Sequence, residues 1–167
     1  MISLPLEKER QRPVVELYGM QALIDTGAVI PMVSMPAKAV EKMFSAVKVK
    51  GNVSLGGIGG RSTGDIYAIP LFSIGEIKYE PFEVFVPYVS KITFPILLSS
   101  TLFYGMSYTV DTVEGKFIID TKNAPLKRKF RIKDLHGELY PQIDDTLIQD
   151  GSMLVEDLAI YSNFSIA

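Results

Sequence analysis

An aspartate interrupts an apolar stretch near the start of the chain, and its neighbours suggest what it can do. Residues 21–34 read QALIDTGAVIPMVS, so Asp25 follows three apolar residues and is followed at once by Thr26 and Gly27. A carboxylate in such a stretch is costly to bury unless hydrogen bonds compensate. Glycine allows a tight loop whose backbone N–H groups can bond the carboxylate, and the threonine hydroxyl can anchor the loop. These flanking residues make the tripeptide a candidate active-site loop.

The scarce residue types restrict the remaining chemistry. The 167 residues include no cysteine and a single histidine, His136. These counts exclude disulfides, thiolate zinc sites, a cysteine nucleophile and any metal site with several histidines. One histidine is also the only possible base for a Ser-His-Asp triad, and no G-x-S-x-G motif accompanies it. We therefore expect no metal and no cofactor, and we expect carboxylates to carry any catalysis.

Length and charge predict one ordinary globular domain. The chain has 17 basic and 19 acidic residues, a balance that favours no highly charged partner. The N-terminal stretch is broken by Pro5 and then becomes charged, so it does not resemble a signal peptide. The longest apolar windows fall short of the roughly 18 residues that a membrane span needs. The expectation is a cytoplasmic protein with no membrane partner.

A basic run near the end of the chain has two interpretations, a nucleic-acid footprint or a solvated strand or connector. Six Lys or Arg residues lie from Lys122 to Lys133, but Phe130 is the one aromatic residue among them, which is not the repeated interleaving that a single-strand binding surface would require. The rest of the chain is slightly acidic. A solvated strand or connector is the better interpretation, so no nucleic-acid partner is expected.

Short strands must position the candidate loop. Segments rich in Val, Ile, Tyr and Phe are separated by Gly, Pro or Asp turns, which is typical of β-strands. They are residues 14–20, 22–24, 29–34, 48–55, 65–75, 77–89, 107–113 and 115–120. Residues 75–77 and 113–115 have the composition of hairpin connections. The predicted fold is all-β, a closed or strongly curled β-barrel that limits open edges.

One or two short helices are expected beside these strands. Residues 35–45 predict a helix because Pro36 suits a first turn, and because four apolar residues fall on one face: Ala39, Val40, Met43 and Phe44. Residues 99–105 could form a second short helix, with Ser99 or Ser100 as its cap and Gly105 at its end.

Three segments, in order along the chain, resemble the aspartic proteases of the retropepsin (retroviral) type. The first is the Asp25-Thr26-Gly27-Ala28 loop after its apolar strand. The second is residues 53–70, two strands around a glycine-rich tip similar to the flap that closes over substrate in that family. The tip residues are Gly56, Gly57, Ile58, Gly59 and Gly60. The third is residues 94–119, similar to the apolar strand, short helix and final hairpin of the domain, with Ser99 where the family usually has glycine.

The resemblance implies a division of the chain and a peptide substrate. Residues 14–121 correspond to a single retropepsin-like protease domain, preceded by an N-terminal segment, 1–13, and followed by a C-terminal extension of unknown role, 122–167. In the family, Thr26 would cross-link two loops, Gly27 would shape the loop and meet the substrate backbone, and Ala28 with the flap residues 56–60 would contact an extended peptide.

The number of catalytic motifs implies two subunits. An aspartic protease needs two carboxylates that share one proton around a water molecule. This chain has one Asp-Thr-Gly; Asp111 and Asp120 lack the glycine and suit ordinary turns. A two-fold homodimer would supply the second Asp25. The function implied is a homodimeric aspartic endopeptidase.

A function from another class stays open. The chain could be a catalytically silent or autoinhibited β module that binds peptide or serves as a dimeric interaction domain. The residues after Thr121 could fold over the groove, extend the dimer interface or be removed by self-cleavage. The intact Asp-Thr-Gly-Ala argues against a silent module, because a buried pair of like charges is costly without chemistry.

Overall fold

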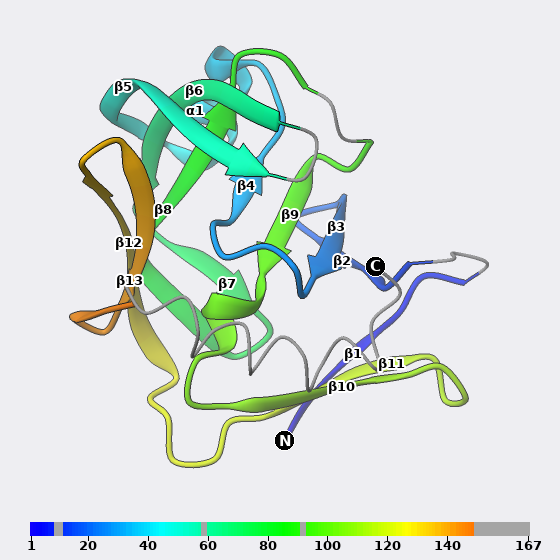
Figure 1. Ribbon diagram of the computed structural model, residues 1–167. Coiled ribbons are helices and arrows are strands. Elements are labelled where there is room, and N and C mark those ends of the chain that lie inside the picture. The colour runs from blue at the N-terminus through cyan, green and yellow to red at the C-terminus, as the bar shows by residue number, and fades with distance from the viewer. Residues whose placement is uncertain (9–11, 58–59, 91–92, 149–167) are drawn as a thin grey trace.

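Strands dominate the protein, as the sequence predicts (Figure 1). The structure is a computed structural model that describes residues 1–8, 12–57, 60–90 and 93–148. The strands are β1 (Ile2–Pro5), β2 (Val14–Leu17), β3 (Met20–Asp25), β4 (Met32–Val33), β5 (Val47–Gly57), β6 (Gly60–Ile69), β7 (Phe72–Ile74), β8 (Ile77–Pro87), β9 (Ile96–Ser99), β10 (Ser107–Asp111), β11 (Lys116–Asp120), β12 (Lys127–Leu135), β13 (Glu138–Ile143) and β14 (Thr146–Leu147). An α-helix, α1 (Ala37–Phe44), and a 3-10 helix, η1 (Ser100–Phe103), complete the described elements.

The described strands form two sheets, and the expected closed barrel is wrong. The larger sheet has the order β14-β13-β12-β8-β4-β9-β3-β2; β6 and β7 also pair with β8, and β5 pairs with β6. Its terminal strands, β14 and β2, do not pair with each other within the described residues. The reason is that β10 and β11 pair with β1 in a separate three-stranded sheet and so do not complete a circle. The all-β class is confirmed.

A ψ-shaped arrangement of three strands holds the Asp25 loop. Strands β3 and β4 are joined by that loop, yet they do not pair with each other. Instead β9 lies between them, parallel to β3 and antiparallel to β4. The three strands present a nearly continuous apolar surface, and Ala22, Ile24 and Leu98 are at most 2% exposed. Burial of this strand trio fixes the direction in which the chain leaves β3.

Helix α1 is shorter than predicted and buries a narrower face. Pro36 precedes its first residue, and Ser45 ends it in a left-handed conformation with φ +53°. Val40 and Phe44 are buried, whereas Met43 is 51% exposed, so the prediction that Met43 faces the core is wrong. With only two turns, the helix turns just two of its four apolar residues fully toward the sheet.

The glycine-rich segment forms the hairpin that the sequence predicts. Strands β5 and β6 pair antiparallel up to Gly57 and Gly60, and β6 continues along β8. The register shifts on both sides of Lys50, which places a bulge at Gly51 and Asn52. The connecting residues Ile58 and Gly59 lie outside the described residues. We call β5 and β6 the flap hairpin.

The segment after residue 121 continues the main sheet. Strand β12 pairs in parallel with β8 and antiparallel with β13. Its alternate residues Phe130 and Ile132 are buried, and the Phe130 ring lies 6.0 Å from that of Phe82 on β8. The basic run is therefore a strand with one face in the core, and Arg128, at 3% exposure, is buried with it. Among the described residues, no helix is both long and apolar enough to cross a membrane.

Candidate active site

Asp25 occupies the last position of β3, directly opposite Ser99 of β9. The chain turns immediately afterward. The Gly27 N–H donates to the Asp25 Oδ1 at 3.0 Å, and the Ala28 N–H donates to the Asp25 carbonyl at 3.2 Å. The Gly27 N–H is a backbone donor of the kind that the sequence predicts for this carboxylate, whereas the Ala28 N–H closes the turn through the backbone. Asp25 itself is only partly buried, so one side of the carboxylate remains open to solvent.

Helix η1 clamps the far side of the same loop. Ser100 donates to the Ala28 carbonyl through both its N–H, at 3.1 Å, and its hydroxyl, at 3.2 Å. The Thr101 hydroxyl donates to the Val29 carbonyl at 2.6 Å. These contacts join residues 72 positions apart in the sequence. They fix the backbone just after Gly27 and therefore the direction of the Asp25 side chain.

Ser99 takes part in this clamp through Thr101. The two hydroxyl oxygens lie 2.8 Å apart, and both residues are almost fully buried. Thr101 has one hydroxyl hydrogen, which the Val29 carbonyl accepts, so Ser99 must be the donor to Thr101. Ser99, Thr101 and the Val29 carbonyl thus form a hydrogen-bond relay. The sequence signal for it is the run of three hydroxyl residues, Ser99, Ser100 and Thr101, that follows apolar residues. Ser99 is the N-cap residue of η1, one of the two caps expected, but its side chain makes no capping hydrogen bond.

The other predicted site residues fall in two groups. Thr26 is 3% exposed and lies within the loop, and Ala28 is half-buried beside it. Gly56 and Gly57 end β5 and Gly60 begins β6, with φ +108° at Gly60. In the sheet order, the flap hairpin is connected to the loop through β8, β4 and β9. Ile58 and Gly59 lie outside the described residues.

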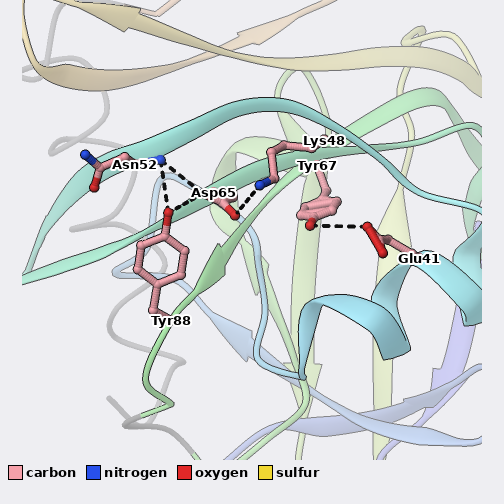
Figure 2. A network of polar contacts seen from close by, with 6 residues as sticks. All are labelled: Glu41, Lys48, Asn52, Asp65, Tyr67 and Tyr88. Carbon is pink, nitrogen blue, oxygen red and sulfur yellow. Dashed lines mark hydrogen bonds and ion pairs between the residues drawn. The ribbon is translucent and has the colours of Figure 1, made fainter.

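A buried carboxylate ties the base of the flap hairpin to the loop after β8. Asp65 on β6 is 6% exposed and accepts hydrogen bonds from the Tyr88 hydroxyl and, at 3.0 Å, from the Asn52 N–H (Figure 2). Lys48 on β5 lies 3.3 Å from it. Beyond Lys48, Tyr67 donates to Glu41 of α1 at 3.5 Å. Sequence reading missed this network, which depends on register across the bulge.

The partners of Asp65 outweigh its burial. Burial alone would raise the pKa of this carboxyl, but hydrogen bonds from Tyr88, Asn52 and Lys48 hold the pKa below its ordinary value. The same contact raises the pKa of the Lys48 amine, because its charge is stabilised by Asp65. Asp65 is thus ionised at neutral pH, with hydrogen-bond partners for its buried carboxylate. It holds the bulge through the N–H of Asn52, whose φ is +57°.

The remaining acidic candidates serve turns. Asp111 accepts hydrogen bonds from the Val113 and Glu114 N–H groups at 3.0 and 2.9 Å. Asp120 accepts one from the Lys122 N–H at 3.0 Å. Neither belongs to the Asp25 loop. Among the described residues, no group of three or more His, Cys, Asp or Glu side chains is placed to hold a metal ion.

Among the described residues, Asp25 is therefore the one carboxylate of this loop, and hydrogen bonds hold the loop on both sides. A lone carboxylate can act as an acid or as a base, but general acid–base hydrolysis needs both roles at once. Comparisons with known proteins do not identify the chain: no protein family matches its sequence, and no curated protein does either.

Proposed function

We propose that this protein is an aspartic endopeptidase that hydrolyses peptide bonds as a homodimer. Within that class, we assign it to the retropepsin-like type, in which each subunit gives one aspartate to a shared site. The observation that carries the proposal is the ψ arrangement: β9 lies between β3 and β4, and Asp25 ends β3, where the loop to β4 begins.

The local contacts support this chemistry. Hydrogen bonds to Asp25 Oδ1 and to the carbonyls of Ala28 and Val29 hold the loop from both sides, so its carboxylate is pre-oriented. In a two-fold dimer, two such loops would meet face to face. Like charges about 3 Å apart cannot both ionise, so the pair would share one proton at working pH.

The shared proton defines the mechanism. The ionised Asp25 takes a proton from a water molecule, which attacks the scissile carbonyl carbon, while the protonated Asp25 of the second copy hydrogen-bonds the carbonyl oxygen. Collapse of the tetrahedral intermediate transfers a proton to the leaving nitrogen. The flap hairpin ends in glycines, which have no side chains to cover their backbone N–H and C=O groups. Such an end suits an extended peptide bound in a strand-like form.

Digestion of a pooled peptide library tests this proposal. Wild-type protein and Asp25→Asn are incubated across pH 4 to 8, and products are read by mass spectrometry. We expect cleavage by wild type only, since Asn cannot accept the proton. Sedimentation of the same samples should show a dimer. A strict monomer at micromolar concentration, or equal cleavage by Asp25→Asn, would contradict the shared dyad. A wild-type dimer that binds peptide without cleaving it would establish the silent module instead.

A further inference from the structure

The β12–β13 hairpin touches both strands of the flap hairpin. Asp134, near the end of β12, places its Oδ2 2.9 Å from the Lys50 amine on β5. Glu138, at the start of β13, places its Oε1 3.3 Å from the Arg61 guanidinium on β6. Figure 1 shows this hairpin, in orange, standing beside the start of β5. Both acidic groups come from one hairpin and both basic groups from the other.

The base of the β12–β13 hairpin is fixed to the core. Strand β12 continues the main sheet beside β8, with Phe130 and Ile132 buried. The Ile132 N–H donates to the buried Glu83 carboxylate of β8 at 2.7 Å. At the free end, the Gly137 N–H donates to the second oxygen of Asp134 at 3.2 Å, which holds the turn in shape. The acidic pair therefore projects from a rigid support.

The basic partners lie where the flap hairpin can bend. Lys50 lies directly before the bulge at Gly51 and Asn52, with a register shift on either side of it. Arg61 follows Gly60 and also donates to the Ser54 hydroxyl across the hairpin at 2.8 Å, so it links β5 and β6. The Lys50–Asp134 ion pair thus lies beside the bulge, where the hairpin can bend. The Arg61–Glu138 ion pair lies farther along the hairpin, near its glycine end. A bulge and a nearby glycine are where a hairpin changes its angle with least strain.

We propose that the β12–β13 hairpin is an electrostatic latch that restrains the angle of the flap hairpin. The proposal rests on the proposed function for its biological meaning, because flap movement would control entry of peptide to Asp25. It assigns a regulatory role to part of the C-terminal extension. Lys50, Arg61 and Glu138 are about half exposed, so the latch is weak enough to release and is sensitive to salt.

Distances between two spin labels test the latch without requiring peptide hydrolysis. The chain has no cysteine, so Thr63→Cys on β6 and Thr109→Cys on β10 can be labelled alone. Labelled protein is diluted with unlabelled protein so that a dimer carries one labelled subunit. We expect Asp134→Asn with Glu138→Gln to increase the population of displaced flap distances about two- to fivefold. Salt at about 1 M, where the Debye length is ~3 Å, should do the same to the unmutated latch.

Matched controls separate the latch from general loosening. Glu80→Gln removes an exposed ion pair with Lys127, 3.4 Å apart, that does not involve the flap, and it should leave the distances unchanged. Exchanging the charges of the other pair, with Arg61→Glu and Glu138→Arg together, should keep the wild-type distribution, because the ion pair is retained in reverse and Asp134 still holds its turn. Identical distributions in wild type and the neutral double variant would overturn the latch, as would equal broadening in Glu80→Gln. If wild type never cleaves peptide, the proposed function fails while the distance result still decides the latch.

Discussion

Asp25 and Ser99 are opposite each other in the parallel pairing of β3 and β9, and each is linked by hydrogen bonds to the loop that follows Asp25. The Asp25 carboxylate accepts a hydrogen bond from the Gly27 N–H, whereas the Ser99 hydroxyl donates to Thr101, which in turn donates to the Val29 carbonyl. The residue at position 99 is therefore part of the site's support. Its identity as serine is explained by the threonine two residues later.

Thr101→Val should loosen the Asp25 loop. The substitution keeps the side-chain shape but leaves the Val29 carbonyl without its buried donor, which costs about 1–3 kcal/mol of unfolding free energy. Urea unfolding measures the loss. Thr101→Ser restores the hydroxyl and should recover most of it. Ser99→Ala should cost less, because Thr101 still donates to Val29. A Ser99→Ala loss larger than that of Thr101→Val would contradict the direction of the relay.

Asp65→Asn should destabilise the protein in a pH-dependent way. The pKa of Asp65 is lowered in the folded state, so its ionised form stabilises the fold above the ordinary value of 3.8. That contribution is lost as the pH falls through the lowered pKa. We expect Asp65→Asn to lower Tm by a few degrees at pH 7, and the difference from wild type to shrink in stronger acid.

Thermal unfolding from pH 7 downward measures this difference. Tyr88→Phe is the matched control, because it removes one donor to Asp65 while leaving the carboxylate to titrate. An Asp65→Asn difference that stays constant down to pH 2 would show that Asp65 is not the titrating group.

Glu83→Gln should have the opposite pH dependence. Burial raises the pKa of Glu83 above its ordinary value of 4.5, although the Ile132 N–H and the charges of Arg131 and Lys133 oppose the shift. A raised pKa means that wild-type stability falls as the pH rises through it. Glutamine keeps the acceptor for Ile132 and does not titrate. The variant should therefore gain stability relative to wild type between pH 4 and pH 8. Urea unfolding at these two values checks it; no change in the difference would contradict the buried-charge cost.

Gly64→Ala should disrupt the junction of β6 with β8. A methyl group there would lie 2.3 Å from the Val86 carbonyl oxygen and 2.8 Å from the Pro87 Cα, both backbone atoms that cannot easily move. We expect a loss of about 1–3 kcal/mol, as for other overpacked positions. Gly57→Ala is the control, because its methyl group would meet only the Gly60 oxygen, at 3.8 Å. Equal unfolding curves for both variants would refute the close approach.

The strand pattern and the Asp25 loop could be predicted because their signals are local. The β7–β8 hairpin forms around Gly75, as the sequence predicts, since Ile74 pairs with Ile77. The loop after Asp25 is bonded by its own backbone, which glycine at position 27 allows. Such features depend on neighbours within a few residues, so a single sequence contains the information.

The place of β12 could not be predicted by counting charges. The basic run hides a two-residue alternation in which Arg128, Phe130 and Ile132 point inward. Arg128 is buried because Asp144, on the turn after β13, lies 2.9 Å away. That partner is 16 residues distant, and only the hairpin brings the two together. Likewise, the open sheet follows from β1 pairing with β11, a contact that joins residues as distant in sequence as Ile2 and Ile119.

The position of β9 between β3 and β4 also determines when the Asp25 loop can acquire its contacts during synthesis. The Asp-Thr-Gly turn leaves the ribosome about 70 residues before the Ser100 and Thr101 that hold it. At roughly 5–20 residues per second, the turn waits about 4–14 s for its partners. For those seconds the nascent chain carries the Asp-Thr-Gly sequence without the contacts from Ser100 and Thr101 that orient it.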